Sequence, residues 1–530
     1  MAKSMIALSG PMGVGKSTVA PLLAQRLGWP WVDIDREIER RVGERLPHLI
    51  RKKGEAFFRR LEADCVREQL GKGPPMVLAL GGGAVEDRAL RHELLEHTVL
   101  VTLKARPETL LSRLSDRPSE RPLLDSENLL ASIVRIVDRR KEAYAEAHRV
   151  LWTDAKSPEE VVEEVLKGFA RDRFSIVVPL GHRSHQVTVG RGVWAWLKEA
   201  LAELAPSMLL VVIDSGAAPL VRPWIEALPW PRRKFFVSGG EASKSLSVLE
   251  RIWDWALSEP IDREAVMLAI GGGAVGDLSA FAAGTLLRGL RLIHLPTTLL
   301  AMVDSAIGGK AALDRPQGKN LVGLFHWPSL VLCDLNALPS LPLPERRSAL
   351  AELIKVAWIS GEKDLCWLEE HLELLLEPEP IWEVLEEAVN MAIRVKVRLV
   401  ARDPEDRDVR RWLNFGHTYG HALEASSGYT LRHGEAVAMG MRVEMAMALA
   451  LGFASEQDQE RLRAILERAG FRASKVGPDL SSIAEFLQVD KKAHARCLEW
   501  VLPSKPGTMV RCRLSREESI ELVKRCAPSC

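Results

Sequence analysis

The sequence predicts an α/β protein with two modules: an N-terminal parallel sheet with flanking helices, and a larger module in which an α/β half precedes a mainly α-helical half. Short apolar runs alternate with helical patterns through the first third of the chain, as in a parallel sheet. The same alternation returns from residue 174, and helical patterns dominate from about residue 340. At 530 residues the chain is also too long for one ordinary domain.

The first module is expected to hold strands at 5–9, 31–35, 76–80 and 98–103, separated by helices. It closes with an amphipathic helix at 157–170, where Ser157 is the expected N-cap, followed by Pro158 and acidic residues. A new strand-like run, FSIVVPL, begins at residue 174. We therefore predict a boundary near 170–174, which gives these domains: 1–170, 174–335 and 336–530.

The second module shows strand-like runs between helices up to about residue 335, and then long helical patterns. The expected strands lie at 174–180, 208–214, 234–239, 265–273 and 291–296. The expected helices of the last part include 351–360, 380–400 and 436–452. The motif GGGAV occurs at 81–85 and at 271–275, but its flanks do not match, so we interpret the two copies as separate glycine turns and not as a duplication.

Composition limits the classes of partner. Lys and Arg total 72 against 71 Asp and Glu, which favours neither nucleic acid nor a membrane surface. No segment approaches the ~20 apolar residues of a membrane span, and the N-terminus MAKSMIALSG is not typical of a signal peptide. The seven Cys form no CxxC pair, which favours reduced thiols and a cytoplasmic protein.

Residues 10–18 read GPMGVGKST and fit the phosphate-binding pattern GxxxxGK[ST] between an expected strand and an expected helix. The glycines allow backbone N–H groups to turn toward phosphates, and the helix N-terminus adds a positive end. Lys16 is expected to reach the β/γ-phosphates of ATP, and Ser17 to hold Mg²⁺. The alternative is a fortuitous glycine turn. The predicted ATP-binding residues are Gly13, Val14, Gly15, Lys16, Ser17 and Thr18.

Nearly all of residues 1–170 resemble the shikimate kinases. The matching segments are Asp33-Ile-Asp35, GEAFFR at 54–59, the glycines at 81–83, RPLL from 121, and Arg140 four residues before Tyr144. The resemblance implies that Asp35 is the base, that Asp33 orders Mg²⁺ through water, and that Arg121 closes as a lid over ATP. The implied shikimate-binding residues are Asp35, Arg59, Gly81, Gly82, Gly83 and Arg140, and the implied catalytic ones are Lys16, Asp35 and Arg121.

Two arginines can clamp a carboxylate, and a carboxylate beside the acceptor hydroxyl can take its proton. Each arginine alone could equally be a solvated surface charge. Another small-molecule P-loop kinase, such as a gluconate kinase, is therefore the alternative for this module.

The strongest cluster of the second module is NFGHTYGH at 414–421 with His433-Gly-Glu. On a helix, His417 and His421 share a face, so spacing alone predicts a metal pair completed by His433 or a carboxylate. Core or surface histidines are the alternative, but only 13 His occur in the chain. The turn GGGAVG at 271–276 follows the apolar run VMLAI, which favours a dinucleotide bound at a Rossmann-like turn.

Residues 174–530 resemble the 3-dehydroquinate synthases. The matching segments are SGGEASK at 238–244, GGGAVGD at 271–277, PTTLLA at 296–301, DSAIGGK at 304–310, GKN at 318–320 and AELIK at 351–355. The resemblance revises the spacing argument: it assigns zinc, or cobalt, to Glu352, His417 and His433, and makes His421 a catalytic residue. Three ligands with an open position are typical of a catalytic zinc.

The resemblance also implies a site for NAD and a cationic site for a substrate with a phosphate and a carboxylate. The implied NAD-binding residues are Asp214, Glu241, Lys244, Gly273, Ala274, Val275, Gly276, Asp277, Thr297, Thr298, Lys310, Lys319, Ala337, Leu338, Pro339 and Ser340. The implied substrate-binding residues are Asp304, Lys310, Asn320, Lys355, Lys396, Arg410, Asn414, His421 and Lys492 (or Lys491). The implied catalytic residues are His421, Lys310, Lys355, Asn320 and Arg288.

The implied reaction is the cyclisation of 3-deoxy-D-arabino-heptulosonate 7-phosphate to 3-dehydroquinate. NAD⁺ oxidises the C5 hydroxyl, phosphate leaves, the hydride returns, and an aldol step closes the ring, with zinc as Lewis acid. The synthases of this family suggest a homodimer formed by residues 174–530. Two further hypotheses are another sugar-phosphate cyclase with another kinase, and a regulatory nucleotide-binding protein with inactive sites.

Overall fold

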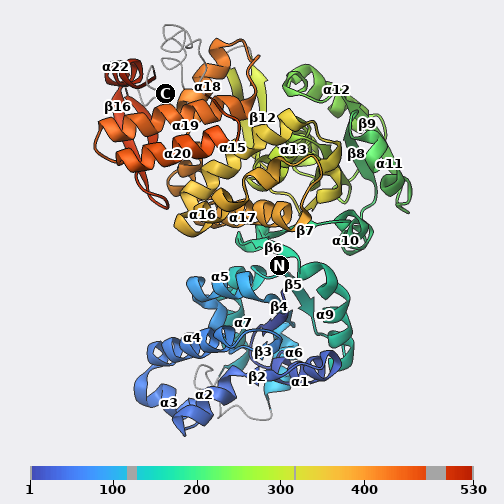
Figure 1. The fold of residues 1–530 in the computed structure, drawn as a ribbon. Coiled ribbons are helices and arrows are strands. Elements are labelled where there is room, and N and C mark those ends of the chain that lie inside the picture. Colours follow the sequence, from blue (N-terminus) through green and yellow to red (C-terminus); the bar gives the residue numbers. More distant parts are fainter. Residues whose placement is uncertain (1–2, 116–127, 316–317, 473–496, 528–530) are drawn as a thin grey trace. The chain divides into compact units, whose positions relative to one another are not determined.

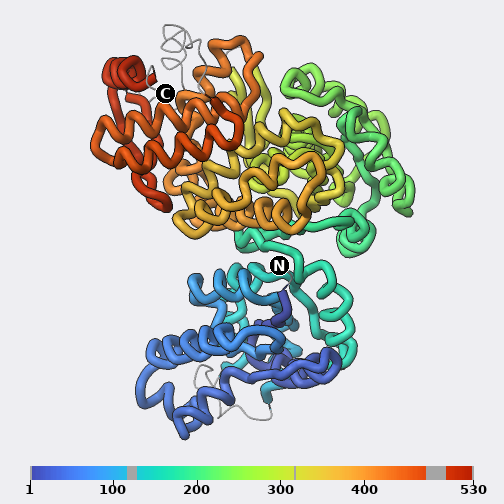
Figure 2. The backbone as a smooth tube through the Cα atoms, viewed as in Figure 1, coloured from blue at the N-terminus to red at the C-terminus, as the bar shows by residue number. Residues whose placement is uncertain are grey.

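The computed structural model describes residues 3–115, 128–315, 318–472 and 497–527 (Figures 1 and 2). The chain divides into two compact units, 1–188 and 189–530. No helix in the described ranges combines the length and the apolar character that a membrane span requires.

The first unit is built on a five-stranded parallel sheet of order β2-β3-β1-β4-β5. Residues alternate between its faces: Met5 and Ala7 belong to the core under α2–α5, and Ile6 and Leu8 to the core under α1, α6 and α9. The elements are β1 (Met5–Ser9), α1 (Lys16–Leu27), β2 (Trp31–Asp33), α2 (Ile34–Val42), α3 (Leu46–Lys53), α4 (Glu55–Gly71), β3 (Met76–Ala79), η1 (Ala84–Glu86), α5 (Arg88–His97), β4 (Val99–Lys104), α6 (Pro107–Leu114), α7 (Leu129–Arg139), α8 (Lys141–Ala145), β5 (Arg149–Trp152) and α9 (Pro158–Asp172).

Helix α9 begins as predicted. The Ser157 side chain accepts from the N–H of Glu160, whose carboxylate accepts from the N–H of Ser157, so that a capping box closes its first turn.

A seven-stranded sheet of order β6-β7-β14-β11-β10-β8-β9 supports the α/β half of the synthase-like region. Strands β14, β11, β10, β8 and the edge strand β9 are parallel, and β6 pairs antiparallel with β7. The elements are β6 (Ser175–Val178), η3 (Gly181–Arg183), β7 (His185–Gly190), η4 (Val193–Trp196), α10 (Leu197–Leu204), β8 (Leu209–Asp214), α11 (Ala218–Glu226), β9 (Arg232–Val237), η5 (Glu241–Ser243), α12 (Leu246–Leu257), β10 (Val266–Gly271), α13 (Gly273–Thr285), η6 (Leu286–Arg288), β11 (Arg291–Pro296), α14 (Leu299–Val303), η7 (Ser305–Ile307), the hairpin β12 (Lys310–Arg315) and β13 (Gly318–Phe325), β14 (Leu330–Asp334) and η8 (Leu335–Ser340).

The helical half follows, drawn from yellow through orange to red in Figure 2. Its elements are α15 (Leu343–Ser360), α16 (Glu362–His371), η9 (Glu373–Leu376), α17 (Trp382–Arg402), η10 (Val409–Asn414), α18 (His417–Ser426), α19 (His433–Ala450), α20 (Glu456–Arg468), the antiparallel hairpin β15 (Cys497–Pro503) and β16 (Met509–Ser515), and α22 (Arg516–Cys526). The predicted fold class, a parallel-sheet module followed by an α/β half and a mainly helical half, is confirmed.

Candidate functional sites

The phosphate-binding turn follows β1 and ends where α1 begins, at Lys16. Gly13 and Gly15 have φ angles of 78° and 107°, which L side chains rarely adopt. The Lys16 ammonium donates to the backbone oxygens of Gly10 (2.7 Å) and Pro11 (3.0 Å), so it folds back over the turn. The turn therefore presents a lysine and a helix N-terminus to the same space, as a triphosphate requires.

Three segments of this site follow three neighbouring strands, because β2, β3 and β1 are adjacent in the sheet. Asp33 ends β2 and caps α2 by accepting from the N–H of Arg36, and Asp35 lies in the first turn of that helix. The glycine loop 81–83 follows β3. Ser17 and Thr18 are exposed in the first turn of α1, after β1. The sequence-predicted residues thus meet at the carboxyl end of the sheet.

A cavity of about 330 Å³ lies beside the glycine loop and is lined in part by Glu55, Arg59, Glu62, Gly83 and Glu86. Arg59 donates to Glu62 over 2.7 Å and to Glu55 over 3.0 Å. Burial raises the pKa of Glu62 to about 7, against the charge of Arg59. The sequence analysis missed Glu62, although its position three residues after Arg59 places both on one face of α4.

Asp35 is held in an unusual environment for a carboxylate. Its Oδ1 is buried without a hydrogen-bond partner among the described residues, and it would lie 2.8 Å from a Cβ added at Gly81. Burial raises the pKa of Asp35, although the Lys16 charge opposes that shift. A buried, unsatisfied carboxylate beside the glycine loop is suited to accept a proton from a bound hydroxyl.

Arg140 is 1% exposed and its guanidinium is fixed on two sides. Nε donates to Glu86 over 2.6 Å, and Nη1 donates to the Gly82 oxygen over 3.0 Å, which also accepts from the Tyr144 hydroxyl. Nη2 is buried without a partner among the described residues. This geometry leaves one N–H edge for an external acceptor such as a carboxylate. The other predicted kinase cation, Arg121, lies outside the described residues.

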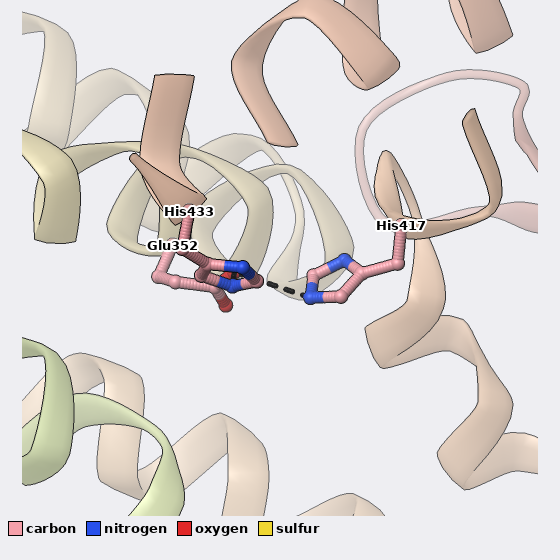
Figure 3. A group of neighbouring side chains, drawn as sticks. All are labelled: Glu352, His417 and His433. Atoms are coloured by element: carbon pink, nitrogen blue, oxygen red, sulfur yellow. Dashed lines mark ion pairs between the residues drawn. The ribbon is translucent and has the colours of Figure 1, made fainter. Parts of the chain in front are cut away.

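Glu352 of α15, His417 of α18 and His433 of α19 converge from three helices (Figure 3). Glu352 Oε1 lies 3.4 Å from His417 Nε2 and 3.5 Å from His433 Nε2. His417 Nδ1 lies 3.1 Å from the Phe415 carbonyl oxygen, which can only accept, so Nε2 keeps its lone pair on the side of Glu352. One carboxylate oxygen and two imidazole nitrogens around a single point fit a zinc-type cation.

The electrostatics of the three donors agree with that fit. Burial raises the pKa of Glu352, but Lys355 and His433 outweigh it and lower that pKa to about 2. Burial also lowers the pKa of His417 well below its ordinary value, helped by Lys355. Burial lowers the pKa of His433 as well, yet Glu352 and Glu424 raise it to about 10. The two carboxylates thus place negative charge around His433, which favours a bound cation.

Glu424 is a residue that the sequence analysis missed. It lies 3.6 Å from His433 Nδ1 and 3.1 Å from the Lys319 ammonium, so it faces the side of His433 away from Glu352. His421, Glu424 and His433 form a second group of close donor atoms. Glu424 lies seven residues, or two helical turns, after His417, so the sequence could have indicated that both side chains share one face of α18.

A cluster of cations lies around Asp304, next to the three donors; Lys396 and Arg410 are buried in it, and Lys310 is half exposed. Lys396 donates to the Asp304 side chain over 2.5 Å, and Arg410 donates to the Gly308 oxygen over 2.6 Å. Burial raises the pKa of Asp304, but Lys396 and Lys355 lower it to about 2, while Glu352 acts in the opposite direction. Lys310 forms an ion pair with Asp406 over 2.5 Å. Burial lowers the pKa of Lys310, and the nearby charge of Arg410 lowers it further. These groups are suited to an anionic ligand beside the metal-type donors.

The other described residues that were predicted to bind substrate or to act on it do not join this cation cluster. Asn414 ends η10, three residues before His417, and His421 is exposed with its ring centroid 5.2 Å from that of His417. Arg288 is exposed on η6 with φ 64°, and among the described residues no hydrogen bond or ion pair joins it to the cation cluster. Lys491 and Lys492 lie outside the described residues.

The segments predicted to bind NAD follow four neighbouring strands, since β14, β11, β10 and β8 are adjacent. Asp214 ends β8, glycines 271–273 join β10 to α13, Thr297 and Thr298 follow β11, and residues 337–340 lie in η8 after β14. A Cβ at Gly272 would lie 3.2 Å from Thr298, so the glycine and threonine segments touch. Carboxyl ends of parallel strands at this position are where α/β sheets bind dinucleotides.

Lys244 joins the cofactor segments to the β12–β13 hairpin. It is 4% exposed, donates to Asp277 over 2.9 Å and contacts Asn320, which has φ 56°. A cavity of about 740 Å³ beside it is lined in part by Glu241, Lys244 and Lys319. The predicted NAD residues and the predicted substrate residue Asn320 therefore belong to one connected region.

Comparisons with known proteins agree with this geometry. The shikimate kinase family model matches residues 12–170, and the N- and C-terminal models of 3-dehydroquinate synthase match 234–348 and 349–493. The 3-dehydroquinate synthase of Symbiobacterium thermophilum is 41% identical over 339 residues, which cover 62% of this chain and 94% of that protein. That of Acidithiobacillus ferrooxidans is 38% identical over 341 residues, covering 63% and 93%.

Two solved structures are similar to the second module. A 2-deoxy-scyllo-inosose synthase complexed with carbaglucose-6-phosphate, NAD⁺ and Co²⁺ has a TM-score of 0.61 at 25% identity, covering 66% of this chain and 100% of that one. The 2-epi-5-epi-valiolone synthase of Streptomyces hygroscopicus subsp. jinggangensis, with NAD⁺ and Zn²⁺ bound, has a TM-score of 0.58 at 25% identity, covering 65% and 97%. Together with the donor geometry, these matches show that the chain belongs to the 3-dehydroquinate synthase family and carries a shikimate kinase domain in front of its synthase.

Proposed function

We propose that the two sites carry out two separate reactions of the shikimate pathway: ATP-dependent 3-phosphorylation of shikimate, and NAD- and zinc-dependent cyclisation of 3-deoxy-D-arabino-heptulosonate 7-phosphate to 3-dehydroquinate with release of phosphate. The observation that carries the second assignment is the convergence of Glu352, His417 and His433 beside a cluster of cations. Cobalt is the alternative metal, because one similar structure contains Co²⁺ and another Zn²⁺.

In the kinase site, Lys16 and the turn glycines bind the ATP phosphates, Ser17 holds Mg²⁺, and Asp33 orders it through water. Arg140 offers Nη2, and Arg59 its guanidinium, to the shikimate carboxylate. Asp35 takes the proton of the attacking hydroxyl. The carboxylate clamp is what favours shikimate over an uncharged sugar acceptor.

In the synthase site, Glu352, His417 and His433 would hold a divalent cation, which would supply Lewis-acid polarisation of the hydroxyl whose carbon is oxidised. NAD held along the ends of β8, β10, β11 and β14 supplies the hydride acceptor. Lys396, Arg410 and Lys310 bind the phosphate and carboxylate of the substrate. We assign Lys355, Asp304, Asn320 and Asn414 to the same substrate site, and His421 to a catalytic role near the phosphate. Identity to 3-dehydroquinate synthases of 38–41%, against 25% for the similar cyclase structures, favours the heptulosonate phosphate over another sugar phosphate.

Metal removal is expected to separate the two activities. Dialysis against a chelator should stop phosphate release from the heptulosonate phosphate in the presence of NAD⁺, and Zn²⁺ or Co²⁺ should restore it, because one of the two reactions depends on the Glu352 site. Shikimate phosphorylation should survive once Mg²⁺ is returned. The control is chelator plus equimolar Zn²⁺. Phosphate release that persists in protein shown to be metal-free by mass spectrometry would reject the assignment of this site.

We also propose a cytoplasmic homodimer formed by the synthase part. Leu321, Val322 and Phe325 expose 36%, 45% and 44% of their surface on β13, and a second copy of the chain would cover such apolar side chains. Light scattering during size-exclusion chromatography is expected to give about twice the chain mass of 58.9 kDa. A monomer mass at micromolar concentration would contradict the dimer and leave the assignment of the two reactions intact.

A further inference from the structure

Glu444 lies on α19, far from the surface, with 0% of its area exposed. Its carboxylate accepts from three backbone N–H groups of a different helix, α18. The N–H of Gly416 is 2.5 Å from Oε2, and those of Thr418 and Tyr419 are 3.1 and 3.3 Å from Oε1. A carboxylate side chain from one helix thus caps the N-terminus of its neighbour.

Helix α18 has no side-chain cap of its own. Its N-cap residue is Gly416, which has φ 79° and no side chain to accept from the first N–H groups. Such groups carry the positive end of the helix dipole, so a carboxylate among them is both hydrogen-bonded and electrostatically favoured. This satisfies a charge that burial would otherwise make very costly.

The capped peptides are those on either side of His417, the first residue of α18. His417 Nδ1 is oriented by the Phe415 carbonyl, in the segment that enters the capped turn. The helix that carries Glu444 begins with His433, the other imidazole donor. One carboxylate therefore links the backbone around one donor to the helix that positions the second.

Close packing makes this link rigid. A Cβ at Gly440 would collide with the Gly416 carbonyl oxygen, and a Cβ at Gly434 would collide with the Ser348 oxygen of α15, the helix of Glu352. Helices α15, α18 and α19 thus approach backbone to backbone at the glycines. At this end of α18 the glycine contacts fix the distance between the helices, and the Glu444 carboxylate holds the first turn.

We propose that Glu444 is a positioning residue of the metal site: it holds the first turn of α18 so that His417 Nε2 meets Glu352 and His433 at the distance that a cation requires. The inference rests on the proposed metal function of those three residues. Groups that orient metal ligands from outside typically change affinity about 10–100-fold when they are replaced.

The test is Glu444→Gln, which keeps the side-chain volume but replaces one acceptor oxygen by an NH₂ group that would face a backbone N–H. The purified full-length protein is stripped of metal and titrated with Co²⁺ and with Zn²⁺ against a competing chelator, at a temperature well below unfolding. We expect affinity to fall about 10–100-fold and the Co²⁺ ligand-field spectrum to change. Shikimate phosphorylation by the same sample reports that the chain is folded and active elsewhere.

The matched control is Leu498→Ala, which removes a fully buried side chain from the hydrophobic cluster that α18 and α19 share with β15. This variant should lower the melting temperature without moving the metal affinity or the Co²⁺ spectrum. A merely structural role of Glu444 predicts the same behaviour for Glu444→Gln, and that outcome overturns the proposal. If Glu444→Gln does not fold, Glu444→Asp carries the test, and unchanged metal affinity in the folded variant overturns the proposal equally. A parent protein that binds neither ion refutes the metal site itself, which is a different result.

Discussion

His417→Ala is expected to abolish phosphate release from the heptulosonate phosphate and to leave shikimate phosphorylation unchanged. The substitution removes one of the two nitrogen donors that face Glu352 Oε1, at 3.4 Å. Lewis-acid polarisation is worth several kcal/mol of transition-state stabilisation, and each 1.36 kcal/mol is tenfold in rate, so a loss of about 10³-fold or more is expected. Continuous phosphate detection with NAD⁺, alongside metal content by mass spectrometry, measures both consequences.

The matched control for that substitution is His371→Ala. His371 ends α16 and stacks on Trp367, with ring centroids 4.6 Å apart, so its loss removes an imidazole of the same module away from the three donors. This variant should retain bound zinc and phosphate release. His417→Ala protein that keeps both one equivalent of zinc and the parent rate would refute the donor set.

Motifs at the ends of strands could be predicted from sequence because local patterns determine them. The glycine turn before Lys16 follows the buried strand β1, and the segment Asp33–Asp35 follows the apolar pair Trp31 and Val32. The parallel sheet brings such strand ends together. The N-cap at Ser157 was likewise predicted from a few consecutive residues. Local chemistry of this kind leaves a signal within one window of the sequence.

Partners that meet only in the tertiary structure left no such signal. Glu444 lies 27 positions after His417 in the apolar segment MRVEMAMALA, which indicates burial, but no local pattern indicates that it caps another helix. Glu86 orients Arg140 from 54 positions away. The sequence analysis also missed the β15–β16 hairpin, because the long helical patterns before it dominate this half and its strand CLEWVLP is short. Sequence alone therefore indicated which groups do the chemistry, but not which groups hold them.

In the kinase site, Asp35→Asn is expected to remove the proton acceptor and to leave the ATP-binding turn intact. The substitution should lower kcat for shikimate phosphorylation by about 10²–10⁴-fold, because asparagine cannot take the proton of the attacking hydroxyl. ATP binding should persist, since the Lys16 turn is a separate segment. Coupled detection of ADP at saturating shikimate measures the loss, and phosphate release by the synthase site in the same sample serves as the internal standard. Asp64→Asn on α4, whose side chain is 76% exposed, should match the parent enzyme.

The pH dependence separates a proton acceptor from a group that only binds hydroxyls. Asp35 must be ionised to act, and burial raises its pKa, so kcat/KM should fall as pH is lowered through a value above that of a free aspartate. The neighbouring Glu62, with its pKa raised to about 7, adds a second ionisation. In Asp35→Asn the step assigned to Asp35 should vanish, and in Glu62→Gln it should remain, because Glu62 is assigned to hold Arg59 and not to take the proton. A parent acid limb that survives unchanged in Asp35→Asn would assign the proton to another group, and the buried carboxylate would then be a ligand for the hydroxyls alone.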